Sequence, residues 1–379
     1  MKNGTNILIP IRKLKLKQKS PSYFIILLFF LILISINSIS KPKRNLFNYD
    51  SEIHLVVQGS GRKSFLSEDY NGVEPYKVIL NGKDIINCCS YGFIGYKNNI
   101  TLIFDIQIED CESMFMNLGN IIEIDLSHFD ASKVTNMISM FDGCSNLENI
   151  KFGNINTSSV KYMKYLFYGC QSLKSIDLSN LDFSNVIIMD SMFEYCTDLK
   201  SINMSNLKTS SVESMAYFFS DCYLNSYDLS QLDLSHVTDI SGMFWGDKNI
   251  KNFSFEIMNI PSVENMRSFF CGCSNLISVD FSNLDFSHVK NMTRMFESCS
   301  SLQKVNFTNL NLSSVKDMRL LFFKCTSLTS VDFTNLDLSQ VTSIARMFNL
   351  AQIYKRLILQ ILIYLLLKIW DIYFMIVKV

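Results

Sequence analysis

The stretch MFEYCTDLKSINMSNLKTSSVESM, Met192–Met215, decides the fold because it returns along the chain at a fixed interval. Residues 295–318 read MFESCSSLQKVNFTNLNLSSVKDM, with apolar residues at most of the same places. Self-similarity at a fixed period of about 20–50 residues is the sequence signature of a repeat architecture. We therefore expect a solenoid of about nine coils over residues 110–348. Ten phenylalanines mark it, with eight intervals of 26 residues and one of 25: Phe115, Phe141, Phe167, Phe193, Phe219, Phe244, Phe270, Phe296, Phe322 and Phe348.

Each coil combines two periodicities. Met137, Met140, Phe141 and Cys144 are spaced i, i+3, i+4 and i+7, which is typical of one apolar stripe on a short helix. Asn136 precedes the stripe as an N-cap residue, and glycines such as Gly143 follow it as a C-terminal signal. A short alternating run then indicates a strand with one buried face, as in Ile176–Ser179. A strand plus a short helix in about 20–29 residues is the leucine-rich-repeat plan.

The motif of Met192–Met215, repeated from Met295, resembles the BspA-like leucine-rich repeats of microbial and protozoan surface proteins. The resemblance covers roughly residues 110–348. It implies an extracellular, non-catalytic role in binding or adhesion, and it carries over no catalytic residue. Two departures mark the sixth coil as the expected weak point: Trp245–Asp247 stands where this coil should carry its cysteine, and the run at 253–263 is degenerate.

The segment before the repeats, residues 41–109, is expected to form a β-rich cap. It contains EIHLVVQ, YKVIL and NNITLIFDIQI, together with an Asn81-Gly82 pair. Alternating apolar residues around an Asn-Gly turn predict a hairpin. A cap shields the open end of a solenoid, and a separate ligand-binding domain is the alternative. The predicted fold class is α/β: a leucine-rich-repeat-like solenoid of about nine 26-residue strand–short-helix coils, with an N-terminal β-rich cap.

Both ends of the chain carry apolar segments. A basic region at 1–22 precedes an apolar run at 23–40, which predicts a secretory signal peptide or an uncleaved signal anchor. Residues 349–379 form an apolar tail that Lys368 and Asp371 interrupt. A membrane span, a helix at the membrane surface and a truncated or misread end remain open for this tail.

Composition excludes several classes of function. Lys+Arg 35 balance Asp+Glu 35, so the broad basic footprint of a nucleic-acid-binding protein is missing. The four histidines have no nucleophile motif beside them, and neither a phosphate-binding loop nor a zinc-ligand spacing occurs. We predict no enzymatic activity, no catalytic residues, no metal and no cofactor.

A row of polar residues occupies one strand position of successive coils, and it is expected to point outward onto the concave face. Asp recurs in every second coil, which keeps like charges off adjacent strands. The row is either an acidic recognition stripe or a solvated structural face. Its candidate binding residues are Asp125, Asp177, Asn203, Asp228, Asp280, Asn306 and Asp332, with Lys151 and Ser254 between them.

Cysteines and sequons give further expectations. Seven in-register cysteines lie on the apolar stripe, where cysteine packs as a small hydrophobe, so we predict a buried ladder of thiols. Cys88, Cys89 and Cys111 are the disulfide candidates in a secreted chain. Glycosylation at Asn203 or Asn306 would block the concave face. The other candidate glycosylation sites are Asn99, Asn156, Asn252, Asn291 and Asn311.

These features predict an exported protein, displayed at the cell surface, membrane-associated or secreted, that binds a protein or glycan through its concave face. Membrane association would use the N-terminal apolar segment, with the C-terminal one as a second candidate. A passive structural coat protein and a signal-anchored scaffold are the alternatives.

Overall fold

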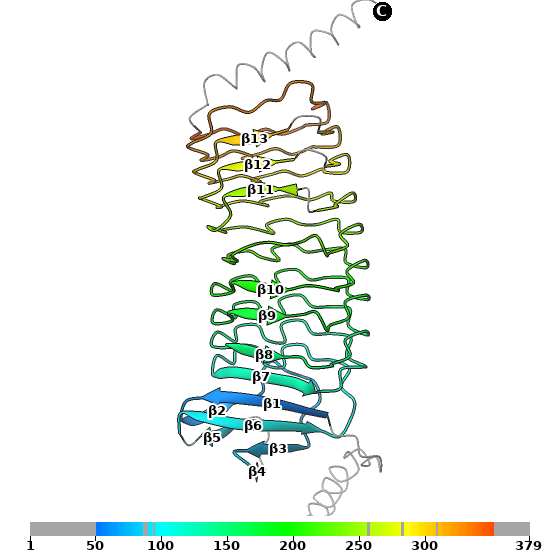
Figure 1. The fold of residues 1–379 in the computed structure, drawn as a ribbon, viewed down its shortest axis with the longest axis vertical. Coiled ribbons are helices and arrows are strands. Elements are labelled where there is room, and N and C mark those ends of the chain that lie inside the picture. Colours follow the sequence, from blue (N-terminus) through cyan, green and yellow to red (C-terminus); the bar gives the residue numbers. More distant parts are fainter. Residues whose placement is uncertain are drawn as a thin grey trace, which may run out of the picture. The chain divides into compact units, whose positions relative to one another are not determined.

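The computed structural model describes residues 51–85, 90–93, 95–255, 258–281, 284–307 and 310–351. The chain divides into two compact units, Met1–Asn48 and Tyr49–Val379, and only the second contains described residues. The described part of this unit is a β-solenoid preceded by a β-rich cap (Figure 1). The predicted signal segment and almost all of the apolar tail lie outside the described residues.

The cap is built on antiparallel pairs. Alternate residues of β1 (Ser51–Gln58) are buried, which is the pattern of a strand with one face on a core. The predicted hairpin is confirmed: β3 and β4 pair through Asn81 and Gly82, which both have positive φ, at 50° and 77°. Two positive φ values are what a two-residue type I′ turn requires. The remaining cap strands are β2 (Gly61–Ser64), β3 (Lys77–Leu80), β4 (Lys83–Ile85), β5 (Ser90–Phe93) and β6 (Lys97–Phe104).

The cap continues directly into the solenoid. Its sheet has the order β4-β3-β6-β1-β7-β8, so the cap strand β1 pairs with cap strand β6 on one side and with the first repeat strand, β7, on the other. β7 (Ile121–His128) is antiparallel to β1 and parallel to β8 (Asn149–Lys151). The first turn of the solenoid therefore has its open edge covered by β1, as a terminal repeat requires.

The solenoid has about seven turns that carry a strand. β9 (Ser175–Asp177) pairs with β10 (Ser201–Asn203) in parallel and in a register of 26 residues. β11 (Asn252–Ser254), β12 (Ser278–Asp280) and β13 (Lys304–Asn306) pair in the same way. The nine coils expected from the sequence are not supported by these strands, which occur in the turns of β7 to β13.

The strand ladder breaks at the 25-residue interval. Residues 225–231, between β10 and β11, contain no strand (Figure 1). The corners nevertheless remain in register, because Ser214 and Asp239 still form a parallel bridge. The one-residue deletion is thus absorbed on the strand side. The break lies next to the sixth coil, which we expected to be weak.

The short helix predicted at each corner is wrong. The residues from Asn136 to Cys144, and their equivalents in other turns, form what we call the corner. Ser139 and Gly143 have positive φ, at 52° and 70°, and this pattern recurs in successive turns. A left-handed residue every four positions interrupts the run of right-handed residues that an α-helix needs. In the parts of the chain that are described, the fold is all-β rather than α/β.

Corner hydrogen bonds explain the arrangement. Asp142 N–H donates to the Ser139 carbonyl at 3.2 Å, which closes a tight turn within the corner. Alternate N–H groups instead donate to the next turn: Ser139 to the Lys164 carbonyl at 2.9 Å and Phe141 to the Leu166 carbonyl at 3.0 Å. Each corner is therefore a pair of tight turns that is hydrogen-bonded to the corner above it, so its backbone groups are satisfied without a helix.

One apolar core runs through the turns. Each of the ten marker phenylalanines stacks on the next, with ring centroids 5.3–6.2 Å apart and planes within 17°. All ten side chains are at most 3% exposed. Methionines and valines of the repeat line the same core. Within the described residues, no helix is long and apolar enough to cross a bilayer.

Candidate functional site

The row of polar residues that we predicted lies on the exposed side of the strands, which we call the strand face. Asp177 pairs in register with Asn203, and Ser254, Asp280 and Asn306 are aligned through β11, β12 and β13. Asp125 stands next to Lys151, whose Nζ lies 3.7 Å from its carboxylate. Asp228 and Asp332 are exposed but lie outside the strands. The structure thus brings most of the row together.

The carboxylates of this face accept hydrogen bonds from the serine or threonine two residues further along the chain. The Ser179 hydroxyl and N–H donate to Asp177 Oδ1 at 2.7 and 3.0 Å. Asn203 receives the same pair of bonds from Ser205, and equivalent bonds reach Asp228 and Asp332. The hydroxyl and N–H donors lower the pKa of Asp177, Asp228 and Asp332. These residues therefore remain charged at neutral pH, and each one also fixes a turn.

A shallow depression lies on this face across β8 to β10. Its volume is about 550 Å³. Ile150, Ile176 and Ile202 line it, with Asp177 and Asn203 beside them. Ile176 is buried, whereas Ile150 and Ile202 are half-buried. The isoleucine of each strand is less exposed than its two neighbours, so the depression presents mainly polar side chains and is an open contact surface rather than an enclosed pocket.

The corners form a second surface, which we call the turn face and which the sequence analysis missed. Five aromatic residues on it make up what we call the aromatic patch. Tyr165 contacts Tyr168 with ring centroids 5.6 Å apart, and Tyr168 contacts Tyr195 at 5.4 Å. Tyr217 contacts Trp245 at 5.6 Å. Tyr195 and Trp245 remain 40% and 42% exposed. These residues do not recur with the 26-residue period, so the repeat pattern conceals them.

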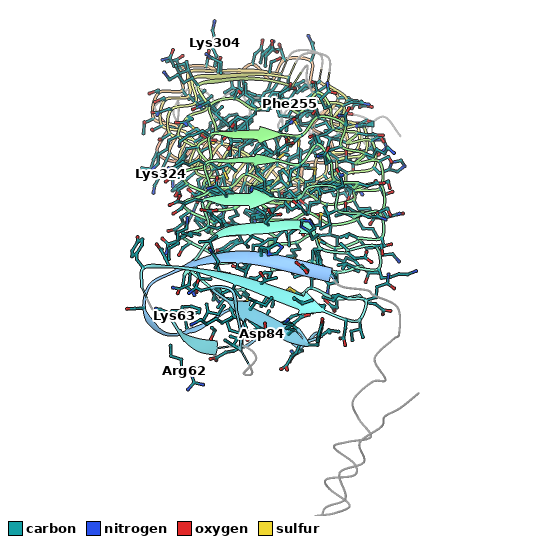
Figure 2. The ribbon with its side chains drawn as sticks, turned by 60° about the horizontal axis from the view of Figure 1, so that its bottom comes forward. Arg62, Lys63, Asp84, Phe255, Lys304 and Lys324 are labelled. Carbon is teal, nitrogen blue, oxygen red and sulfur yellow. The ribbon has the colours of Figure 1, made fainter. Side chains whose placement is uncertain are left out.

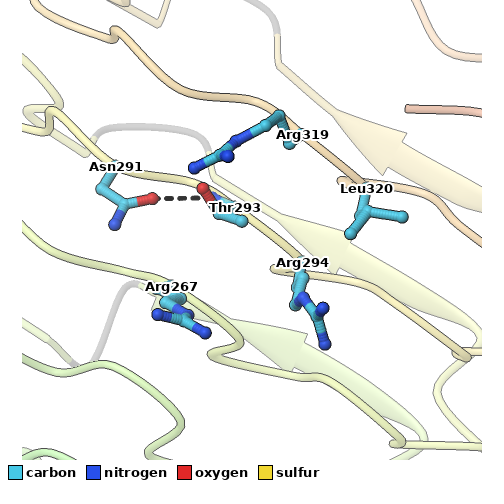
Figure 3. Close-up of a pocket in the computed structure, with 6 residues that line it drawn as sticks. All are labelled: Arg267, Asn291, Thr293, Arg294, Arg319 and Leu320. Atoms are coloured by element: carbon cyan, nitrogen blue, oxygen red, sulfur yellow. Dashed lines mark hydrogen bonds between the residues drawn. The ribbon is translucent and has the colours of Figure 1, made fainter. Parts of the chain in front are cut away.

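A cluster of arginines occupies the turn face further along the solenoid. It surrounds a cavity of about 180 Å³ that is lined by Arg267, Asn291, Thr293, Arg294, Arg319 and Leu320 (Figure 3). Arg319 donates to both carboxylate oxygens of Asp317, with Nη2 at 2.6 Å from Oδ2. Arg294 Nε lies 3.5 Å from Glu297. Two of the three guanidinium groups are therefore neutralised in place, which leaves little attraction for an added anion.

The predicted ladder of buried thiols is present. Cys144, Cys170, Cys196, Cys222, Cys273, Cys299 and Cys325 are free and fully buried. Each Sγ lies 2.6–3.2 Å from the backbone carbonyl oxygen of a phenylalanine in the preceding turn. Burial raises the pKa of each thiol, so the ladder is unreactive as well as inaccessible.

The expected disulfide at Cys111 is not formed. Cys111 is a free, fully buried thiol at the corner position that most later turns fill with methionine. Its burial in the core explains why it has no access to a partner thiol. Cys88 and Cys89 lie outside the described residues, and a disulfide there stays a prediction.

Glycosylation also stays a prediction. Six of the seven sequon asparagines are exposed, and Asn291 is half-buried at the arginine cluster. In the described ranges, no group of three or more His, Cys, Asp or Glu side chains is placed to hold a metal ion.

Comparison with known proteins identifies the family of this chain. A family model described as "Mycoplasma protein of unknown function, DUF285" matches residues 109–226, 170–259 and 249–360. The three overlapping matches together cover about two thirds of the chain. The chain belongs to this family. The DUF285 matches begin at the predicted start of the repeats and extend past the last marker phenylalanine, so the family is defined by the solenoid. No curated protein matches the chain.

Two of the solved structures that are similar to this DUF285 chain are leucine-rich repeat proteins. One from Bacteroides ovatus is 20% identical, with 61% of this chain and 71% of that chain covered and a TM-score of 0.33. One from Eubacterium ventriosum is 17% identical, with 62% and 78% covered and a TM-score of 0.30. The geometry of the turns rests on the hydrogen bonds of this chain itself.

Proposed function

We propose that this protein is a non-catalytic recognition module that is exported and displayed at the cell surface. Its strand face binds a protein or glycan partner, as an adhesion surface does. The neighbouring turns act as a scaffold that holds the polar side chains at fixed spacing.

The register of the strand face is the observation that supports this proposal. Across β11 to β13 the equivalent side chains Ser254, Asp280 and Asn306 are exposed and aligned. The residue before each of these polar side chains faces the core and is buried, as Val279 is at 2% exposure. A row of polar groups fixed on a packed core loses little conformational entropy when it binds a partner.

A passive structural role is the second candidate, and the turn hydrogen bonds favour it. Asp177 and Asp228 use one carboxylate oxygen to fix Ser179 and Ser230, so a structural reason for them exists without any partner. In that case the strand face would be a solvated surface, and its charge would be unimportant for binding.

Substitution of Asp by Asn separates the two roles, because the chain itself uses Asn203 and Asn306 at equivalent positions. The triple variant Asp177→Asn, Asp228→Asn, Asp280→Asn should keep every turn and remove three charges. We expect it to lose at least tenfold in binding to whichever immobilised glycan or protein captures the wild type on an array. Equal binding by both would support the passive role.

A matched control uses a second row of turn-forming aspartates. Ser184, Ser235 and Ser287 each donate a backbone N–H to one of these carboxylates, at 2.8–3.0 Å. The variant Asp182→Asn, Asp233→Asn, Asp285→Asn makes the same charge change away from the strand face. It should bind as the wild type does.

Export is tested separately. We expect N-terminal sequencing of the mature chain to place its start between residues 23 and 50, and external protease to cut it on intact cells. An enzymatic deglycosylation that lowers its mass would locate sugar on the sequons. A chain that retains Met1 and resists external protease would contradict surface display.

A further inference from the structure

The aromatic patch occupies backbone positions where large side chains are costly. Tyr165, Tyr195 and Tyr217 have φ of 58°, 61° and 56°. A left-handed conformation costs a non-glycine residue roughly 1–2 kcal/mol. Other turns place Gly169 and Gly242 at the positions of Tyr195 and Tyr217. Most other turns also carry non-glycine residues with positive φ at these positions, so the left-handed conformation is a general feature of the corners, and this patch is set apart by the size and clustering of its rings.

The fold also makes room for these rings. A Cβ atom at Gly242 would lie 2.3 Å from Cε1 of Tyr217, so the ring of Tyr217 lies over the bare backbone of the next turn. Tyr217 in turn contacts Trp245. This pair depends on the absence of a side chain at residue 242.

Two carboxylates, Glu194 and Asp221, lie near rings of the patch. Burial and the charge of Glu194 raise the pKa of both Tyr168 and Tyr195, with Asp221 adding to the effect on Tyr195. Burial raises the pKa of Tyr217, an effect that Arg267 opposes and Glu194 strengthens. Glu194 is therefore close to tyrosines from both halves of the patch. Its own pKa is raised by burial, so it gains from a cation brought against it.

One basic side chain of the chain already shows how such a surface is used. Lys164 Nζ lies 4.8 Å from the centroid of the Tyr165 ring and 4.0 Å from an oxygen of Asp190. The ammonium group thus contacts an aromatic face and a carboxylate together, as a cation–π contact beside an ion pair. Tyr195 and Trp245, the most exposed rings of the patch, offer their surface next to Glu194 and Asp221.

We propose that the aromatic patch is a docking site for a basic segment of a partner protein. Lysine or arginine side chains of that segment lie over Tyr195 and Trp245 and place their charges against Glu194 and Asp221. Tyr and Trp are the residues most often enriched at such contacts. A neutral glycan would gain nothing from the carboxylates, and an acidic partner would be repelled. The site lies on the turn face and does not depend on the function proposed for the strand face.

The test uses probes of defined charge. A fluorescein-labelled deca-lysine peptide is titrated with the full chain at low salt and followed by fluorescence anisotropy. Deca-glutamate and cellohexaose are run in parallel as acidic and neutral probes. We expect binding of deca-lysine only, weakening as salt rises.

The variants are taken from the chain's own turns, so that folding is preserved. Tyr195→Gly and Tyr217→Gly copy Gly169 and Gly242, and Trp245→Ser copies Ser220 of the preceding turn. The triple variant should bind deca-lysine at least tenfold more weakly and melt no lower than the wild type. Glu194→Gln should weaken binding several-fold with all rings in place.

Controls lie in the cap. Tyr96 is 77% exposed there, and Asp84 lies at the cap end of the molecule (Figure 2). Tyr96→Ala and Asp84→Asn should leave peptide binding unchanged, as should the triple Asp→Asn variant of the strand face. Unchanged binding in the aromatic triple variant, or tighter binding of cellohexaose than of deca-lysine, would overturn the proposal.

Discussion

The thiol of Cys170 donates a hydrogen bond to the backbone carbonyl of Phe141 in the preceding turn, with 3.2 Å between sulfur and oxygen. The same carbonyl accepts the N–H of Cys144 at 3.1 Å. The cysteine ladder therefore links successive corners as well as filling the core. Cysteine suits this place because its thiol is both a small hydrophobe and a weak donor.

Replacing one cysteine of the ladder should show how much its hydrogen bond contributes to stability. Cys170→Ala loses the hydrogen bond and leaves a small cavity, so we expect the free energy of unfolding to fall by about 1–2 kcal/mol. Urea denaturation followed by circular dichroism measures it. Cys271→Ala is the control, because Cys271 is 8% exposed and lies outside the ladder. An equal loss in both variants would show that the hydrogen bond contributes nothing.

Thiol labelling tests the burial of the ladder. Iodoacetamide at pH 8 should leave Cys144, Cys170 and Cys299 unmodified in the folded chain, because they are 0% exposed and burial raises their pKa. The same residues should react fully in denaturant. Mass spectrometry of peptides gives the result. Modification of the folded ladder, or a disulfide within it, would contradict this arrangement.

Asp247 should make stability depend on pH. It occupies the ladder position of a cysteine, is 0% exposed, and its Oδ2 has no hydrogen-bond partner. Burial raises its pKa to about 7, although the N–H groups of Asn249 and Ile250 donate to its other oxygen. The folded chain thus holds a proton that the unfolded chain releases near pH 4, so stability is lost as pH rises from about 4 to 7.

The variant Asp247→Asn isolates that effect. Asn keeps an oxygen for the two N–H groups and cannot ionise, so it should remove this part of the pH dependence. We compare the unfolding free energy of the variant with that of the wild type at each pH. This difference should be about 2–4 kcal/mol more favourable to the variant at pH 8 than at pH 4. Parallel stability curves for the two proteins between pH 4 and pH 8 would show that Asp247 is ionised in the fold.

Replacing a corner glycine should destabilise the fold because of its positive φ, even where the added side chain clashes with no neighbour. Gly272 has φ of 79°, and an added Cβ would meet nothing closer than 3.5 Å. Gly272→Ala should therefore cost about 1 kcal/mol through backbone strain rather than through a clash. Gly92, which has open space and no positive φ, is the control and should tolerate alanine. Thermal unfolding of both variants checks this, and equal melting temperatures would count against left-handed corners.

The repeat, its core and the hairpin of the cap could be predicted from the sequence because each depends on local periodicity. Phe141 has an equivalent in all ten corners and Cys144 is one of seven in-register cysteines, so their burial follows from the repeat alone. The register of Asp177 and Asn203 follows in the same way, since equivalent residues of a solenoid must lie side by side.

The corner and the turn face could not be predicted in this way. The spacing of Met137, Met140, Phe141 and Cys144 fits a helix, yet two tight turns give the same spacing. The available signal was the residue two places after each phenylalanine, which is Asn117, Gly143, Gly169, Gly246 or Gly272 in half of the turns. Those residues tolerate positive φ, and helix interiors avoid them. The aromatic patch left no periodic signal.

The central claim is that successive 26-residue windows are equivalent turns around one shared core. A crystal structure of the chain tests it most directly. It should show Phe141, Phe167 and Phe193 as one buried stack, with centroids 5.3 and 5.5 Å apart. Rings that point into solvent, or that are separated by other side chains, would contradict the solenoid. The binding surfaces proposed on the strand face and at the aromatic patch would then be contradicted as well.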